Sequence, residues 1–330
     1  MEECESVRKR LIHFPSEKRE VLSPLKLSYD HLSVHLKRCL AYCLIFPPEY
    51  EFEKEKLVHL WMAEGFLQLP GESRSMEEVG DEYFRELLLR SFLQRSNGNK
   101  SRFMMQDLMS YLATLVSGKF CFRLEYDDTS GMNAWTRHLS LFRRKYDCPM
   151  IFEAIDKAKF IITCLSLDHE SSHFSSIKLQ NLLSKLQFLR VLSLSHYHIT
   201  ELPVSINKLK HLRYMNLSHT AIKILPETVC ALYNLQTLIL SNCHYLTKLP
   251  KNMWKLINLR HLDIIGTNLN EMPKEMSRLG SLQTLLTLLS AKKVAQQSKS
   301  WGGFYIFMEH FKFRSCKTWS LQKMQLRQAW

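Results

Sequence analysis

The sequence lacks the segments that place a protein in or across a membrane. Its 330 residues contain no run of about 18 apolar residues, so no transmembrane helix is predicted. The first ten residues contain no apolar stretch of the kind found in secretory signals. Nine cysteines, an odd number at scattered spacings, do not indicate a disulfide framework and are typical of reduced thiols. These absences together favour a cytoplasmic protein.

The sequence also lacks a phosphate-binding loop. No G-x-x-x-x-G-K-[ST] string occurs, because Gly118-Lys119 has Ala113 in place of the first glycine and Phe120 in place of Ser or Thr. Without that loop there is no nest of backbone N–H groups to hold phosphates. No Ser/His/Asp order, Cys/His pair or carboxylate pair is specified by spacing either. We therefore expect no catalytic residues and no enzymatic activity.

Metal ligands are present but badly spaced. His31, His35, Cys39 and Cys43 follow one another at four-residue intervals, and twelve residues of helix span about 18 Å. Four such ligands cannot meet one zinc ion at roughly 2.0–2.3 Å. A second partial set has no evident fourth ligand: Cys164, His169 and His173. We expect no metal site.

Positive charge is concentrated at the end of the chain. The net charge is +13, and residues 292–330 contain eight Lys or Arg against Glu309 alone, which accounts for +7. The remaining +6 is weak evidence for a nucleic-acid surface. The same tail is aromatic, has neither helical nor strand periodicity, and is predicted to lie outside any repeat. It is either an interfacial anchor or an extension that leaves the preceding segment uncapped.

A leucine repeat occupies the middle of the chain. Five leucines recur at intervals of 23, 23, 24 and 23 residues: Leu189, Leu212, Leu235, Leu259 and Leu282. A second set keeps the same period: Leu202-Pro203, Leu225-Pro226, Leu249-Pro250 and Met272-Pro273. This period with L-x-x-L-x-L predicts a leucine-rich-repeat solenoid, in which parallel strands line an extended binding face.

Alternation along each short strand separates inward from outward side chains. Met215 and Leu217 are predicted to point inward, and Cys243 occupies a structural slot at the coil's turn. The outward side chains form a row that is the natural contact surface for a protein partner. The predicted partner-binding residues are Val191, Ser193, Tyr214, Asn216, Thr237, Ile239, His261 and Asp263. Considered singly, each is equally well explained as a solvated strand residue.

The first part of the chain has the pattern of a winged helix. Helical periodicity is seen up to Cys43 and over residues 53–66 and 76–92, followed by an Asn-Gly hairpin within residues 94–103. A fourth helix is expected from Met105 to Val116 and a strand over residues 120–126. The helix over 76–92 carries a charge of −3, which opposes DNA binding because phosphate neutralisation supplies most of that affinity. We expect no nucleic-acid partner.

Long strings in this region carry a family resemblance: Leu25-Lys-Leu-Ser-Tyr-Asp-His-Leu32, Tyr42-Cys-Leu-Ile-Phe-Pro47 and Leu60-Trp-Met-Ala-Glu-Gly-Phe66. Together with the repeats, they resemble the winged-helix part of the NB-ARC domain in plant disease-resistance proteins, the coiled-coil type of intracellular immune receptor. The resemblance covers residues 20–286 and implies an α+β multidomain fold. It also implies a receptor that switches between ADP and ATP states while its repeats sense an effector. The match begins only at the winged helix, so a truncated family member is expected.

The resemblance places Met105-Gln106-Asp107 on the family's Met-His-Asp motif, whose histidine contacts the nucleotide. Gln106 cannot carry an imidazolium charge, and an N-cap-like pair opening a helix explains Gln106 and Asp107 as well. Without the phosphate loop, no cofactor is expected for this chain. The alternative is an ADP/ATP-dependent switch that retains nucleotide binding through the winged helix.

The predicted organisation has four parts. Residues 1–126 form the winged-helix part of an NB-ARC domain, 127–184 a connector that caps the solenoid, 185–286 the repeats, and 287–330 the basic aromatic tail. The predicted function is that of a disease-resistance receptor fragment. Its expected partners are a pathogen effector, a guarded host protein or a full-length receptor. Self-association is expected through the uncapped end, where leucines 279, 282 and 285 would be exposed.

Overall fold

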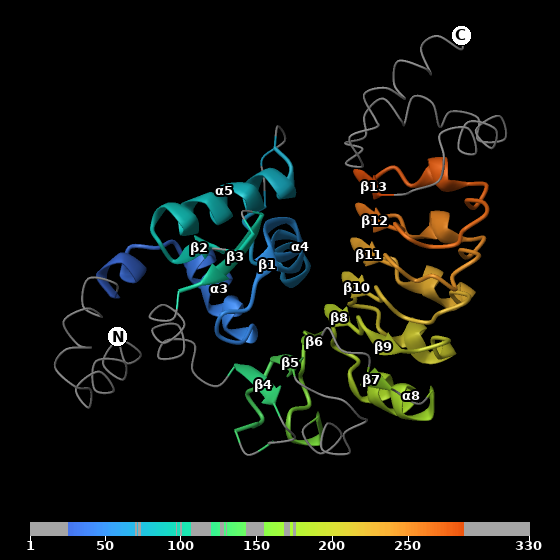
Figure 1. Cartoon of the computed structure of the whole chain (residues 1–330), viewed down its shortest axis with the longest axis horizontal. Helices are drawn as coiled ribbons and strands as arrows, with labels where there is room; N and C mark the ends of the chain where they lie inside the picture. The colour runs from blue at the N-terminus through green and yellow to red at the C-terminus, as the bar shows by residue number, and fades with distance from the viewer. Residues whose placement is uncertain are drawn as a thin grey trace, which may run out of the picture. The chain divides into compact units, whose positions relative to one another are not determined.

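The computed structural model describes residues 26–69, 71, 74–96, 98–99, 101–106, 120–125, 129, 131–142, 155–167, 172–173 and 176–286 (Figure 1). The chain divides into two compact units, and the division passes through strands β5 and β6. The first unit comprises Met1–Ser140 with Asp156–Thr163, and the second comprises Leu141–Ile155 with Cys164–Trp330. The predicted tail and Asp107 lie outside the described residues.

Three helices form the body of the first unit: α3 (Val34–Tyr42), α4 (Lys54–Glu64) and α5 (Met76–Leu89). Each begins or ends for a local reason. The Ser33 hydroxyl accepts a hydrogen bond from the Leu36 amide at the start of α3, and Ser75 with Glu78 forms a capping box at the start of α5. A short 3-10 helix, η1 (Cys43–Ile45), follows α3 where the sequence reaches the two prolines.

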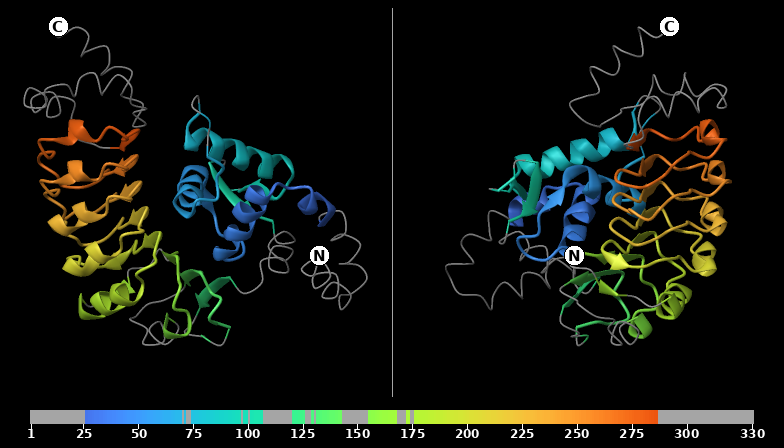
Figure 2. Two further views of the ribbon diagram at one scale, coloured as in Figure 1. Left: turned by 180° about the vertical axis from the view of Figure 1, so that it is seen from behind. Right: turned by 45° about the vertical axis from the view of Figure 1, so that its right-hand side comes forward.

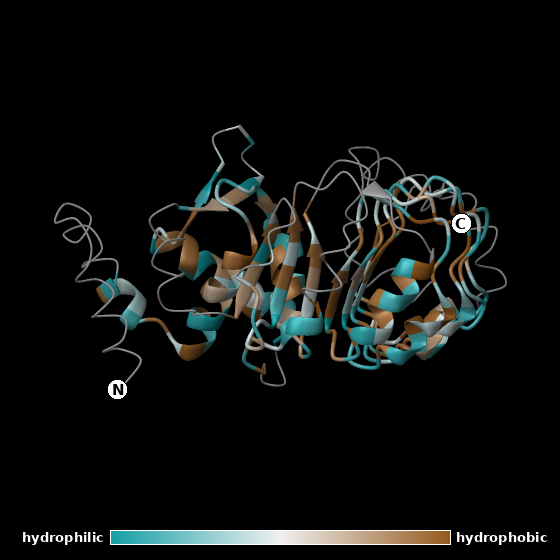
Figure 3. Cartoon of the chain, turned by 90° about the horizontal axis from the view of Figure 1, so that it is seen from below, coloured by the Kyte–Doolittle hydropathy of each residue, from teal (hydrophilic) through white to brown (hydrophobic). Residues whose placement is uncertain are grey.

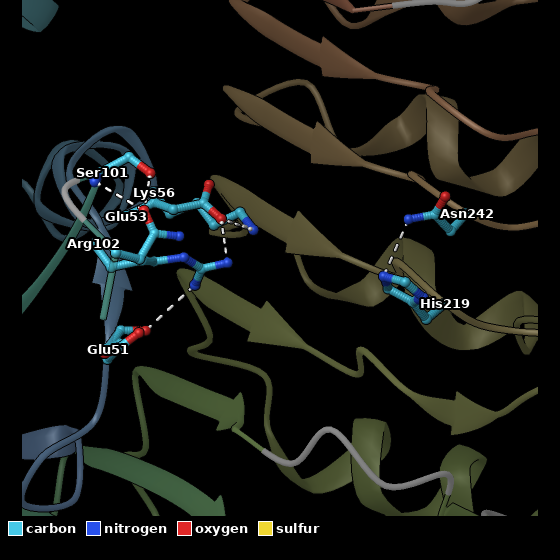
Figure 4. A network of polar contacts seen from close by, with 8 residues as sticks. Glu51, Glu53, Lys56, Ser101, Arg102, His219 and Asn242 are labelled. Carbon is cyan, nitrogen blue, oxygen red and sulfur yellow. Dashed lines mark hydrogen bonds and ion pairs between the residues drawn. The ribbon is translucent and has the colours of Figure 1, made fainter. Parts of the chain in front are cut away.

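A three-stranded sheet completes the winged helix. Strands β2 (Leu93–Arg95) and β3 (Arg102–Met105) pair antiparallel, which confirms the predicted hairpin. The two-residue strand β1 (Phe52–Glu53) pairs with the other edge of β3. Ion pairs join β3 to β1 and β1 to α4. The Arg102 guanidinium lies 3.0 Å from the Glu53 carboxylate, which lies 3.2 Å from the Lys56 ammonium group (Figure 4). Met105 ends β3, so the prediction that it opens a helix is wrong.

Strand β4 (Cys121–Glu125) follows within the same unit, where a strand was predicted. It is fixed to η1 and to the residue that follows it, because the Arg123 guanidinium donates to the carbonyls of Leu44 (3.1 Å) and Phe46 (3.2 Å). Strands β5 (His138–Phe142) and β6 (Thr163–Ser166) come next along the chain. Both lie within residues 127–184, the segment predicted to be the connector.

The second unit is a stack of coils, each of which contributes one strand to a shared parallel sheet (Figures 1 and 2). The strands are β8 (Val191–Ser193), β10 (Tyr214–Asn216), β11 (Thr237–Ile239), β12 (His261–Asp263) and β13 (Thr284–Leu286). All four neighbouring pairs are parallel, and Met215 lies opposite both Leu192 and Leu238. The predicted solenoid is confirmed, with five parallel strands in register.

The side of each coil opposite its strand carries a 3-10 helix (Figure 2). These are η2 (Val204–Lys208), η3 (Glu227–Ala231), η4 (Met253–Lys255) and η5 (Met276–Arg278). Pro203 and Pro226 stand at the N-caps of the first two with ψ of 147°. The Leu-Pro positions therefore turn the chain, because proline has a fixed φ and no N–H to donate to a ladder.

Apolar residues recur from coil to coil along the repeats, as the hydropathy colouring shows (Figure 3). Met215 and Leu217 are completely buried, as alternation predicts. At the beginning of the stack, β6 is the neighbour of β8, and helix α8 (Ser176–Lys185) precedes the first repeat. Buried leucines on α8 and directly after it follow helical spacing: Leu179, Leu182, Leu183 and Leu186.

The last coil departs from expectation. Leu279, Leu282 and Leu285 are at most 5% exposed, so the prediction of an apolar end open to water is wrong. Leu285 lies on a fifth strand, β13, opposite Leu262 of β12. These leucines therefore give no basis for self-association.

Candidate recognition surface of the repeats

The eight predicted contact residues lie together on four neighbouring strands. One column is formed at the first position of each strand by Val191, Tyr214, Thr237 and His261. A second column is formed at the third position by Ser193, Asn216, Ile239 and Asp263. The parallel register places each column's members on adjacent strands about 4.8 Å apart. The repeat period thus predicts their assembly into one face.

Their exposure differs from the prediction. Val191, Ser193, Tyr214, Thr237, Ile239 and His261 are all buried, with exposed fractions of 0 to 6%. Only Asn216 and Asp263 are half-exposed. The interpretation of these positions as solvated strand residues is therefore wrong for six of the eight. Binding along the row requires these side chains to become accessible.

Asn216 and Asp263 have a structural role as well. The Asn216 side-chain oxygen accepts a hydrogen bond from the Ser218 amide (2.9 Å), and Asp263 accepts one from the Ile265 amide (3.1 Å). Both are Asx-type turns, in which the side chain replaces a backbone acceptor as the chain leaves the strand. Substitution of either residue would therefore alter the turn along with the surface.

A column of basic and amide side chains precedes the strands. It consists of Arg190, Arg213, Gln236, Arg260 and Gln283, each immediately after a repeat leucine and each half-exposed. Backbone bonds join them in order, for example from the Arg213 amide to the Arg190 carbonyl (2.8 Å). The contact row predicted from the sequence did not include them, although the same period of 23 or 24 residues marks their positions. They give this edge of the sheet a positive charge.

At the opposite end of the strands, each coil turns through a left-handed residue. His196, His219, Asn242 and Gly266 have φ of 63°, 58°, 58° and 73°. The rings of His196 and His219 stack 4.3 Å apart, and the Asn242 amide nitrogen lies 3.1 Å from His219 Nε2 (Figure 4). Side-chain stacking and hydrogen bonding along this ladder offset the cost of left-handed backbone in non-glycine residues.

The residue after the left-handed one in each turn occupies the position at which Cys243 was predicted to have a structural role. Cys243 is buried, and its thiol donates to the Leu217 carbonyl (3.0 Å). The Thr220 hydroxyl donates to the same carbonyl (2.8 Å), and the Thr267 hydroxyl makes the equivalent bond two coils further on (2.8 Å, to Ile264). Burial raises the pKa of the Cys243 thiol, so little thiolate is present to react.

The other candidate ligands do not come together. His31 is exposed, His35 Nδ1 lies 2.9 Å from the Phe66 carbonyl oxygen, and Cys39 and Cys43 are buried. Burial raises the pKa of both thiols. Within the described part of the chain, no group of three metal-ligating residues is present. Gln106 is half-exposed just beyond β3, and its predicted partner Asp107 falls outside that part.

Two known protein families match this chain, one in each half of the sequence. The profile of the disease resistance protein winged helix domain matches residues 45–113, and that of a leucine-rich repeat region matches residues 161–254. A candidate disease resistance protein of Arabidopsis thaliana is 49% identical over 238 residues, which are 71% of this chain and 17% of that protein. The chain belongs to the NB-ARC leucine-rich-repeat family of plant disease resistance proteins.

Two further members of this resistance-protein family support the assignment. RPP13-like protein 1 of Arabidopsis thaliana is 45% identical over 194 residues, 58% of this chain and 18% of that protein. Disease resistance protein RGA2 of Solanum bulbocastanum is 46% identical over 104 residues, 31% of this chain and 11% of that protein. The chain therefore spans less than a fifth of the length of these relatives.

Solved structures add little to the family assignment. A leucine-rich-repeat protein of Leptospira interrogans aligns with a TM-score of 0.40 and 26% identity, over 51% of this chain and 48% of that one. We draw no argument from a similarity at this level. Among the described residues, no helix has both the length and the apolar character needed to cross a membrane.

Proposed function

We propose that this chain acts in plant defence, as the winged-helix and repeat portion of a disease-resistance receptor. The proposal rests on one observation: a winged helix of the resistance-protein type precedes a leucine-rich-repeat sheet in a single chain, and the resistance proteins match across both. Its repeats bind a protein, which is a pathogen effector, a guarded host protein or a full-length receptor. This activity is carried out in the cytoplasm and involves no catalysis.

The surface that fits this role is the strand face with its basic edge. The strands form a continuous parallel sheet, and a solenoid sheet of this kind offers many side chains to one extended partner. Arg190, Arg213 and Arg260 are half-exposed along its edge, so they add long polar side chains to the surface that a partner would meet. If the six buried contact residues became accessible, they would add apolar and hydroxyl contacts with the partner.

The test is co-immunoprecipitation from leaf tissue against a defined panel of pathogen effectors and full-length resistance proteins, including RPP13-like protein 1. Ser241→Arg places a long charged side chain at a half-exposed position two residues beyond β11. Val204→Arg is the matched control, because Val204 is 66% exposed on η2. We expect Ser241→Arg to abolish capture of the bound protein and Val204→Arg to leave it intact. Equal capture by both variants would contradict the proposed face.

For the nucleotide, we propose that this chain does not bind ADP or ATP measurably. The sequence has no phosphate loop, and Gln106 stands where the family motif has histidine. Calorimetric titration with ADP should therefore give no binding heat. Micromolar affinity that is lost in Gln106→Ala would overturn this proposal and would support the alternative of a nucleotide-dependent switch operating through the winged helix.

A further inference from the structure

Three polar side chains meet in the interior of the first unit: Glu64, His138 and Thr163. Glu64 is the last residue of α4 and is 2% exposed, and Thr163 is completely buried. The Thr163 hydroxyl donates a hydrogen bond to Glu64 Oε1. His138 Nδ1 lies 3.1 Å from the Thr163 hydroxyl oxygen and 3.7 Å from Glu64 Oε1. We call these three residues the Glu64 triad.

The triad has a consistent direction of hydrogen bonding. Because the Thr163 hydroxyl donates to the carboxylate, its oxygen is left to accept from His138 Nδ1–H, which assigns the proton to that nitrogen. A buried carboxylate is costly unless it is paired and hydrogen-bonded. Removal of one member therefore takes a hydrogen-bond or ionic partner away from the other two.

The end of α4 presents Glu64 to this site. Gly65 takes the left-handed conformation (φ 75°), and the amides of Gly65 and Phe66 bond back to the carbonyls of Met62 (3.0 Å) and Trp61 (3.1 Å). This Schellman turn ends the helix at Glu64 and reverses the chain.

Aromatic rings then surround the imidazole of the triad. Tyr42 and Phe66 are both edge-on to His138, with ring centroids 5.1 and 6.2 Å away. The rings limit the orientations open to the imidazole, which keeps Nδ1 directed at Thr163.

The other two members of the triad come from strands β5 and β6. Within the first unit, the Thr163 amide donates to the Arg137 carbonyl (3.1 Å), and the His138 amide donates to the Phe120 carbonyl (3.0 Å). These backbone bonds hold the strand segments to one another. The triad is what ties them, through side chains, to the C-terminus of α4.

We propose that Glu64 is a conformational latch. Its carboxylate fixes the beginning of β5 and β6 to the end of α4, and its loss releases these strand segments while the winged helix stays folded. Strand β6 continues beyond Thr163 into the second unit along the chain, so a displacement of that strand reaches α4 through the triad. The inference does not depend on the proposed function.

Hydrogen exchange of the full chain tests the latch. Glu64→Gln removes the charge and keeps the shape, and Thr163→Val removes the hydroxyl at nearly constant volume. In each variant we expect amides of residues 137–140 and 162–163 to exchange about tenfold faster or more, the size of one lost charge-assisted hydrogen bond. Exchange over α5 and the β2–β3 hairpin should remain unchanged. In the double variant, the acceleration of exchange should be smaller than the product of the two single accelerations, because the two residues act together.

The matched control is Glu82→Gln, which removes an exposed carboxylate that pairs with Arg74 on the surface of the same unit. It should leave exchange in β5 and β6 as in the parent. Unchanged exchange in Glu64→Gln and Thr163→Val would overturn the proposal. Equal acceleration over β5, β6 and α5 would also overturn it, since that result indicates general destabilisation. If Glu64→Gln does not fold, Thr163→Val decides by the same criteria.

Discussion

Replacing Gly80 with alanine should destabilise the first unit, against the usual effect of this substitution. Gly80 lies in the interior of α5 and is buried. A glycine in a helix interior costs about 0.5–1 kcal/mol relative to alanine, so propensity alone predicts a gain from Gly80→Ala. The structure predicts a loss, because α4 lies too close for an added methyl group.

The space at Gly80 decides the sign. A Cβ there would overlap Val58 Cγ1 on α4 and lie 3.2 Å from Leu67 Cδ1. Val58 is 2% exposed and β-branched, and a β-branched residue in a helix has one strongly preferred rotamer. It cannot swing aside, so the helices must separate. Overpacking of this kind costs about 1–3 kcal/mol, which exceeds the gain and leaves a net loss of about 1–2 kcal/mol.

Urea unfolding followed by circular dichroism at 222 nm measures this loss, because α3, α4 and α5 all belong to the first unit. Gly71→Ala is the control, since its added Cβ meets nothing within 4 Å. Val58→Ala should rescue Gly80→Ala, with a coupling of about 1 kcal/mol or more. If Gly80→Ala stabilises the protein, or if the two substitutions are additive, the close approach of α4 and α5 is wrong.

Three further predictions concern the repeats. Leu238→Ala should cost about 2–5 kcal/mol in urea unfolding, because Leu238 is completely buried between Met215 and Leu262; a cost below about 1 kcal/mol would contradict the register. Gly266→Ala should lower the melting temperature, because Gly266 is left-handed and a Cβ there would overlap the Asn242 side chain; left-handed backbone costs alanine about 1–2 kcal/mol. Glu227 is exposed, and the small loss of hydration there raises its pKa, but hydrogen bonds from the amides of Lys251 (2.6 Å) and Asn252 (3.3 Å) outweigh this and hold the pKa below its ordinary value. Its contribution to stability is therefore present above the ordinary glutamate pKa of about 4.3 and is lost as pH falls through the lower folded value. Glu227→Gln should remove this part of the acid sensitivity in melting curves, and an unchanged pH profile would contradict it.

The sequence predicted the repeats well because their period is a packing constraint. Leucines recur every 23 or 24 residues since each coil must place one apolar side chain above the last, and Leu192, Met215, Leu238 and Leu262 indeed lie in register. The winged helix was equally predictable from the sequence, because its helices have continuous apolar faces. Strand β1 was missed because two residues are too few to show alternation.

Exposure was harder to predict than position. Alternation states that Tyr214 and Met215 point to opposite faces of a strand, but whether the outer face is covered depends on the tertiary structure. Tyr214 is 3% exposed, contrary to its interpretation as a solvated residue. The same limit applies to Glu64, since a glutamate at the end of a helix has the pattern of a surface residue. Its burial depends on β5 and β6, about 75 and 100 residues further along the chain.

The measurement that tests the central proposal most directly is hydrogen exchange of this chain with and without its protein partner. If the strand face is the recognition surface, binding should slow exchange over residues 213–219, 236–242 and 260–266, which form the strands and turns of three neighbouring coils. The 3-10 segments η2 to η5 on the other side of the coils should exchange as in the free chain. Protection confined to η2–η5 would show that the repeats bind their partner through a different face.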